Sequence, residues 1–375
     1  MNITSFKSYS PSDMANLAAS DLANVTVDVA KGLSSSQIQA LQSDQVTALS
    51  GVIFSLSSQQ IAAFTPYQIE SGLSTASIAQ ASGKQLQSLS NSQVQAMSVD
   101  QVNAITDSSF KDLTVSQVKA LTADQLMGMD AAQMSQMSVQ QVTSLSSEQL
   151  DAVGNLGNNI KNLSIAQFTA LTDAQVASID PSQISQITLA QLGTLGDRVN
   201  LLNEDQVVQL SASQTRSLSS SQLTGLDTAG TLAALSNTAV AALQKTQLAG
   251  FAGVSHMTEE QLGALSGSQV GWLSATQLNA LSSDQVTDLG ERVSRISAAH
   301  LATLAPQQVA ALDTTQITAL TVDQVSALTE PQLRSLSNSQ VQALVFTNGS
   351  NDHQMTALRP DQVGQLSDEI GRAHV

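Results

Sequence analysis

The amino-acid sequence predicts an all-α solenoid in which each eight-residue repeat forms one short capped helix. An octad of the form [Ser/Thr]-x-x-Gln-[Val/Ile/Leu]-x-[Ala/Ser]-Leu recurs along most of the chain, as at Thr321–Leu328. Its first and fourth residues form a capping box, the hydrogen-bonded pattern that starts a helix. Its apolar fifth and eighth residues share one helical face, which we expect to be buried.

Proline and acidic residues mark the same helix start. Proline favours the first helical residue, N1, and the second position of the octad holds Pro11, Pro66, Pro181, Pro306 and Pro360, whereas Pro331 falls one residue later. The helix dipole favours negative charge in the first turn, and many third positions are acidic. The first position is therefore predicted as the N-cap and the fourth as N3.

Each predicted helix is too short to be stable alone. It spans only about 10 Å at 1.5 Å per residue, so neighbouring octads must cover one another, as in a solenoid. A single continuous helix does not fit, because eight residues advance about 800° and the apolar stripe would rotate by roughly 80° per repeat. A β-solenoid with stacked glutamines is the structural alternative, against which the N1 prolines and capping boxes count.

The glutamine at the fourth position has two possible roles. In a capping box it accepts a hydrogen bond from the N-cap N–H of its own octad. In a stacked column it would instead bond to neighbouring repeats. The sequence favours the capping role.

The repeat pattern predicts one domain with short flanking segments. We expect a leader at residues 1–9 and a single octad-repeat solenoid at residues 10–368. Its register breaks lie near residues 50–55, 154–162, 196–202, 252–257, 290–296 and 345–353. Glycine after the last apolar residue is a helix stop signal, so these breaks are expected to be longer helices or loops. Two of them share a motif, Gly196-Asp-Arg-Val and Gly290-Glu-Arg-Val.

The last seven residues, 369–375, leave the octad pattern. Their sequence, Glu-Ile-Gly-Arg-Ala-His-Val, looks like an in-frame translation of a short-read sequencing adapter. We therefore expect this tail to be an artefact and the true C-terminus to be missing.

Composition excludes several classes of function. The net charge of −16 argues against nucleic-acid binding, which requires basic patches. The absence of cysteine excludes disulfides, thiolate metal sites and a cysteine nucleophile. The N-terminal residues lack the apolar region of a Sec signal, and no apolar run is long enough for a transmembrane helix.

No catalytic, cofactor-binding or metal site is predicted. The histidines, His256, His300, His353 and His374, are isolated in the sequence, and a metal site or catalytic triad requires converging partners. The stretch Asn348–Asp352 is interpreted as a polar turn. Trp272 takes the place of a small residue, either as an exposed contact or as the filling of a local gap. We expect no enzyme activity and no cofactor.

Stretches such as Ala120–Leu126, Ala170–Val176 and Ala319–Val325 resemble the A-L-T-T-x-Q-[VIL] octapeptide arrays of large bacterial repeat proteins. That resemblance implies an exported or surface-displayed protein and no catalytic residues. We expect a non-enzymatic scaffold or spacer, located outside a bacterial cell or on its surface, with a cytoplasmic location as the alternative. The alternative function is a protein-binding solenoid, such as a secreted effector or adhesin, that uses its concave face or inter-repeat insertions to bind a protein or cell-surface partner.

Overall fold

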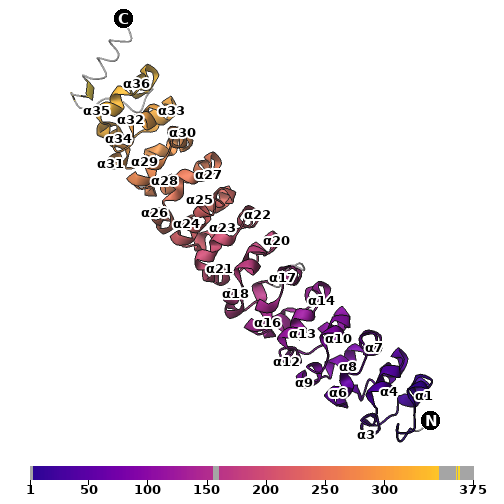
Figure 1. Ribbon diagram of the computed structural model, residues 1–375. Coiled ribbons are helices and arrows are strands. Elements are labelled where there is room, and N and C mark those ends of the chain that lie inside the picture. The colour runs from indigo at the N-terminus through magenta and orange to yellow at the C-terminus, as the bar shows by residue number, and fades with distance from the viewer. Residues whose placement is uncertain (1–2, 155–159, 346–359, 361, 364–375) are drawn as a thin grey trace. The chain divides into compact units, whose positions relative to one another are not determined.

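The computed structural model describes residues 3–154, 160–345, 360 and 362–363. Within these residues the regular elements are α-helices and 3-10 helices, with no strand, so the helical solenoid is confirmed and the β-solenoid alternative is wrong. Contacts between residues divide the chain into two compact units, Met1–Thr194 and Leu195–Val375. Figure 1 shows the helices of each unit.

The helices of the first unit, with 3-10 helices marked η, are α1 (Pro11–Ala15), α2 (Ala19–Leu22), α3 (Val27–Ala30), α4 (Ser35–Ala40), α5 (Ser43–Ala48), η1 (Ile53–Ser55), α6 (Ser58–Ile61), α7 (Pro66–Gly72), α8 (Thr75–Ala79), α9 (Gly83–Leu86), α10 (Asn91–Ala96), α11 (Val99–Asn103), α12 (Asp107–Phe110), α13 (Val115–Ala120), α14 (Ala123–Met127), α15 (Ala131–Gln136), α16 (Val139–Ser144), α17 (Ser147–Gly154), η2 (Ile160–Asn162), α18 (Ile165–Ala170), α19 (Asp173–Ala177), α20 (Pro181–Ile184) and α21 (Leu189–Thr194).

The helices of the second unit are η3 (Gly196–Leu201), α22 (Glu204–Val207), α23 (Ala212–Ser217), α24 (Ser220–Thr228), η4 (Leu232–Ala234), α25 (Asn237–Ala241), α26 (Lys245–Gly250), η5 (Gly253–His256), α27 (Glu259–Ala264), α28 (Gly267–Trp272), α29 (Ala275–Ala280), α30 (Ser283–Asp288), η6 (Gly290–Arg295), α31 (Ala298–Leu301), α32 (Pro306–Ala310), α33 (Thr314–Ala319), α34 (Val322–Ala327), α35 (Glu330–Arg334) and α36 (Asn338–Val345).

The octad folds locally as its residue types require, as α34 shows. Thr321 is the N-cap, in an extended conformation, and its hydroxyl accepts the backbone N–H of Gln324 at 3.3 Å. The glutamine side chain accepts the backbone N–H of Thr321 at 2.8 Å, which completes the capping box. Leu328 returns to an extended conformation and ends the helix. The predicted helix start and stop are both confirmed here.

The core is thin and aliphatic, because each octad contributes only its fifth and eighth side chains. In α34 these are Val325 and Leu328, and both are fully buried. Larger residues occupy the same fifth position in a few octads, as Phe110 and Phe168 do, and they are buried as well. Burial of one short apolar face per helix stabilises helices that would be unstable in isolation.

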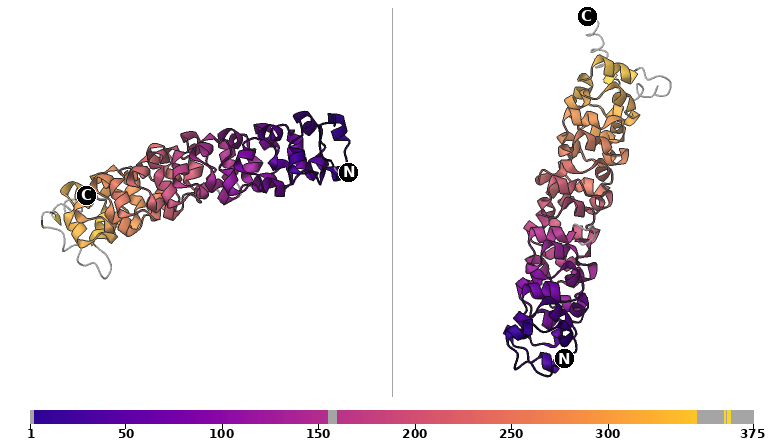
Figure 2. Two further views of the ribbon diagram at one scale, coloured as in Figure 1. Left: turned by 90° about the horizontal axis from the view of Figure 1, so that it is seen from below. Right: turned by 90° about the vertical axis from the view of Figure 1, so that its right-hand side faces the viewer.

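Each unit is a solenoid whose coil contains between three and four octads. Helices three octads apart pack side by side, for example α10 with α13 and α13 with α16 in the first unit. In the second unit α31 packs on α34 in the same way. Figures 1 and 2 show the successive helices of each unit winding around its axis and progressing along it.

Register breaks hold 3-10 helices. The helices η1, η3, η5 and η6 lie at the breaks predicted near residues 50–55, 196–202, 252–257 and 290–296. The break near 154–162 includes η2, whereas residues 155–159 and most of the break near 345–353 lie outside the described residues. The sequence analysis overlooked one such element, η4. The tail at 369–375 also lies outside the described residues, and a single array over residues 10–368 stays a prediction.

The residues predicted as a leader are packed against the first helices. Phe6 is only 1% exposed, and its ring meets that of Tyr9 edge-on at 6.0 Å between centroids. The carbonyl oxygens of Phe6 and Tyr9 accept hydrogen bonds from Gln37 at 2.9 and 2.7 Å. The described part of this segment, residues 3–9, therefore takes the place of a preceding coil, because its carbonyl groups accept from a glutamine of the next one.

Candidate functional site

The glutamine of the octad bonds within its own helix and also to the previous coil. In α14, the Gln125 Oε1 accepts the N–H of Thr122 at 2.8 Å. Its Nε2 donates to the carbonyl oxygens of Val94 and Met97, at 3.0 and 2.6 Å. Those two carbonyls belong to α10 and its C-cap, and the Val94 carbonyl also accepts the N–H of Met97 at 3.2 Å. One side chain thus caps the start of its own helix and the end of an earlier one.

This arrangement repeats through both units, and we call it the glutamine ladder. Its members accept an N–H from their own N-cap residue and donate to carbonyl oxygens of the preceding coil. In the first unit they are Gln37, Gln45, Gln60, Gln68, Gln93, Gln101, Gln117, Gln125, Gln133, Gln141, Gln149, Gln167, Gln175 and Gln191. In the second they are Gln247, Gln261, Gln269, Gln277, Gln285, Gln308, Gln316, Gln324, Gln332 and Gln340.

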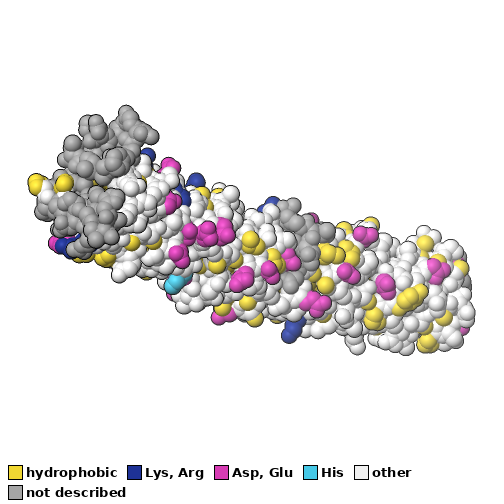
Figure 3. Space-filling view, turned by 90° about the horizontal axis from the view of Figure 1, so that it is seen from above, with side chains coloured by type: hydrophobic (Ala, Val, Ile, Leu, Met, Phe, Trp, Pro, Cys, Tyr) yellow, Lys and Arg dark blue, Asp and Glu magenta, His cyan; other side chains and the backbone are white. Residues whose placement is uncertain are grey.

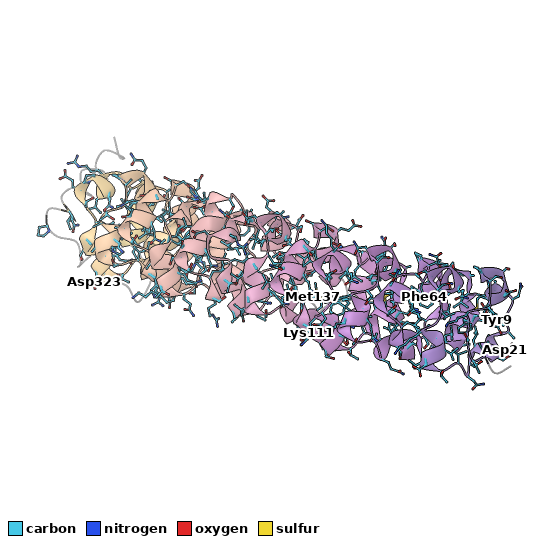
Figure 4. All side chains as sticks on the ribbon, turned by 60° about the horizontal axis from the view of Figure 1, so that its bottom comes forward. Tyr9, Asp21, Phe64, Lys111, Met137 and Asp323 are labelled. Atoms are coloured by element: carbon cyan, nitrogen blue, oxygen red, sulfur yellow. The ribbon has the colours of Figure 1, made fainter. Side chains whose placement is uncertain are left out.

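The two roles predicted as alternatives for this glutamine therefore occur together. Figure 4 labels Phe64 and Met137, whose buried carbonyl groups accept from the ladder residues Gln93 and Gln167. Since most ladder glutamines are buried and bonded at both side-chain atoms, the ladder holds the solenoid together and offers little to a ligand. The octad pattern alone does not show which carbonyl groups the second role involves, because that depends on the coil length.

Some octads replace the ladder glutamine and keep fewer of its bonds. Ser109 is shorter, and its hydroxyl reaches one carbonyl, that of Ala81, at 2.9 Å. His300 keeps the backbone bond to the hydroxyl of Ser297 at 3.1 Å, but its ring Nδ1 is buried without a hydrogen-bond partner. These octads are locally weaker members of the same array.

Arg292 takes over the ladder's role in the register break at η6. Its Nη1 donates to the carbonyl oxygens of Leu262, Gly263 and Leu265, which end α27. Its Nε donates to the carbonyl oxygen of Leu289 at 2.7 Å, and its Nη2 to that of Asp288 at 3.0 Å. Burial lowers the pKa of this guanidinium. In this copy of the Gly-x-Arg-Val motif the arginine therefore replaces glutamine where the helix changes to 3-10.

Carboxylates gather near this arginine. Burial raises the pKa of Asp288, and the charges of Asp284 and Glu260 add to that rise. The pKa of Glu260 itself is lowered, by hydrogen bonds from its own backbone and from Thr258. Within the described residues no group of three histidine or acidic side chains has the geometry of a metal site.

The structure pairs one histidine that the sequence analysis treated as isolated. The Nδ1 of His256, at the end of η5, lies 2.7 Å from the Oδ1 of Asp227 in α24. Asp227 is mostly covered, whereas the histidine side chain is largely exposed. The two residues lie one coil apart, so only the coil length would have predicted the pair. His353, His374 and the stretch Asn348–Asp352 lie outside the described residues.

Two hollows lie beside register breaks. One, of about 540 Å³, is polar and includes Lys31, Ser34 and Ser57 in its lining, next to η1. The other, of about 340 Å³, borders η5 and includes Phe251 and Thr276. Trp272, the residue predicted as an exposed contact or a gap filler, is half-buried at the end of α28. Both hollows lie next to predicted insertions.

The exposed surface carries many acidic side chains, as Figure 3 shows for one face. Asp323 is one of the exposed acidic residues of the chain. Among the helices that the structure describes, none is both long enough and apolar enough to cross a membrane.

No curated protein matches the chain. Residues 293–330 match the family described as ALTTAQ repeat, which agrees with the resemblance identified from the octads.

Proposed function

We propose that the chain is a non-enzymatic structural protein that serves as an extended scaffold or spacer of a bacterial surface or secreted protein. The glutamine ladder supports this proposal most directly, because its side-chain amides form hydrogen bonds that join one coil to the next. A solenoid of near-equivalent coils gains length by adding repeats, without new kinds of contact. The resemblance to surface-displayed octapeptide arrays supports the location outside the cell.

A protein-binding solenoid, such as an adhesin or secreted effector, is the second candidate. The two hollows beside η1 and η5 support it, because insertions between repeats often build a binding surface. The two functions predict different effects of deleting whole coils and of changing the residues at one register break. A spacer depends on the number of coils, whereas a binder depends on the residues at one break.

A deletion of three octads tests the spacer. The cysteine-free chain allows spin labels at Ser36→Cys and Ser185→Cys, two exposed positions within the first unit. Deleting residues 98–121 should shorten the label distance by about one helix spacing, roughly 8–10 Å, in double electron–electron resonance. The shortened chain should keep its helical circular dichroism per residue. An unchanged distance, or loss of the helical signal, would contradict the proposal.

Location is tested separately on intact bacterial cells that produce the protein. A protease that cannot enter cells should remove the chain if it lies outside, while a cytoplasmic control protein stays intact. Protection of the chain until the cells are lysed would place it in the cytoplasm and overturn this part of the proposal.

A further inference from the structure

One row of helices in the first unit exposes an aliphatic residue at each helix start. The helices α10, α13, α16, α18 and α21 pack on one another in that order, as can be followed in Figure 1. The last four begin with Val115, Val139, Ile165 and Leu189, whose exposed fractions are 38%, 39%, 44% and 49%. Single exposed aliphatic residues are ordinary on protein surfaces, but a row of four on neighbouring helices is a patch.

The same row carries no carboxylate. Its octads, residues 90–97, 114–121, 138–145, 164–171 and 188–194, have one charged side chain among them, that of Lys119. The octads between them in the sequence are acidic, with Asp100, Asp107, Asp124, Asp130, Glu148, Asp173 and Asp180. In a chain with 30 acidic and 14 basic residues, this row stands out as neutral. We call these five helices the neutral row.

N1 does not require an aliphatic residue. Acidic residues are favoured there by the helix dipole, and α12 and α19 begin with Asp107 and Asp173. One N1 valine outside the row, Val99, has a packing partner. A Cβ added to Gly128 would lie 2.2 Å from the Cγ1 of Val99, so that valine lies directly against the backbone of the next coil. The neutral row instead leaves its aliphatic side chains partly open to solvent.

We propose that the neutral row is the surface on which a second copy of the chain docks. Two copies that each carry a charge of −16 repel one another over most of their surface. The repulsion is weakest where both faces lack carboxylates, and there the exposed aliphatic side chains can be buried together. A two-fold axis brings the same row of both copies into contact, so the surface is its own complement.

The size of the row fits a weak dimer. Packed helices lie about 8–10 Å apart, so five of them span roughly 40 Å. With a width of roughly 12 Å, the row offers on the order of 500 Å² per copy and 1,000 Å² in total. Specific interfaces begin near that area, and we therefore expect reversible association that depends on protein concentration.

Sedimentation equilibrium of the full chain tests the proposal. The weight-average mass should rise above 39.0 kDa with protein concentration. Added salt should strengthen the association, because it screens the repulsion between the acidic copies. A mass that stays monomeric over about 10 to 500 μM chain, at low and at high salt, would overturn it.

Aspartate at N1 provides a substitution that spares the fold. The double variant Val139→Asp, Ile165→Asp should weaken the dimer tenfold or more, yet keep the helical circular dichroism and the melting temperature. Val322→Asp is the matched control, because Val322 is a 43% exposed N1 residue of α34 in the second unit. A dimer that survives the double variant, or that Val322→Asp weakens equally, would contradict docking at the neutral row.

Discussion

At the scale of single residues, the ladder glutamine joins two hydrogen-bonding duties that can be separated. Gln308 accepts the N–H of Ala305 at 2.9 Å and donates to the carbonyl oxygens of Leu278 and Leu281, at 3.0 and 2.7 Å. A glutamate of the same shape keeps the first bond, but its ionised form cannot donate the others. Its neighbour Gln307 is exposed in the same helix and provides the control.

We predict that Gln308→Glu is destabilising at neutral pH by about 2–4 kcal/mol, because it places a charge against two buried carbonyl oxygens. Desolvation and those oxygens raise the folded-state pKa of the new carboxyl above its unfolded value of about 4.3. Stability is therefore retained below the unfolded pKa and lost as pH rises through the folded pKa.

Urea denaturation at several pH values measures this dependence. The free energy of unfolding of Gln308→Glu should fall below that of the parent chain as the pH rises from about 4 to 7. That of Gln307→Glu should stay within about 0.5 kcal/mol of the parent value at every pH. A deficit for Gln308→Glu that is equal at pH 4 and pH 7 would show that the donated bonds do not matter.

Residue patterns favoured the first of these duties and offered the second only as an alternative to it. Thr321 and Gln324 read as a capping box from the sequence alone, since that interaction spans only three residues. The bonds from Gln324 to Val293 and Ile296, at 2.9 and 2.6 Å, cross a whole coil. The coil length depends on the angle between successive short helices, which a repeated octad does not encode in its pattern. The pair of His256 and Asp227 was missed for the same physical reason.

At the scale of elements, the 3-10 helix η6 keeps its bonds to the preceding coil because arginine replaces glutamine there. Gly290 opens η6 with φ of +58°, a left-handed conformation that favours glycine, and Gly196 opens η3 with φ of +53°. The planar guanidinium of Arg292 then reaches carbonyl groups of its own break and of α27. The sequence analysis identified both motifs, but local sequence does not show which distant carbonyl groups the arginine reaches.

We predict that Arg292→Lys costs about 2–4 kcal/mol, because one ammonium group has three donors and cannot reproduce the guanidinium fork. Arg295→Lys, at an exposed residue of the same 3-10 helix, should change stability by less than about 0.5 kcal/mol. Thermal melts and urea denaturation of both variants provide the comparison. Equal stability of the two variants would mean that η6 is held by its apolar contacts alone.

At the scale of the whole molecule, folding should depend only on keeping whole octads. Docking of a second copy should depend on which octads share the neutral row. Deleting one octad, residues 122–129, leaves every later glutamine in register with an earlier helix. It also changes which helices lie three octads apart, so that α16 would pack on α12 instead of α13. Deleting the three octads at residues 98–121 keeps α10 and α16 in one row.

We therefore predict that both deletions keep the helical signal per residue, whereas the one-octad deletion weakens the dimer more, because it places α12 with the acidic Asp107 beside α16. Circular dichroism and sedimentation equilibrium measure the two properties on the same samples. Deleting four residues, 124–127, is the control, because it removes a cap without restoring the register and should lower helicity. Equal weakening of the dimer by the two octad deletions would argue against the neutral row, and loss of helicity in both would argue against equivalent octads.

The direction of the glutamine ladder has a consequence for how the protein is made. Every ladder glutamine donates to carbonyl groups that precede it in the chain, by 28 residues for the Gln125–Met97 pair. During synthesis on the ribosome the acceptors therefore emerge before their donors. At about 5–20 residues per second, a new coil follows every few seconds and finds the previous one already available. The protein is thus suited to fold progressively from its N-terminus as it is translated, each coil serving as the template for the next.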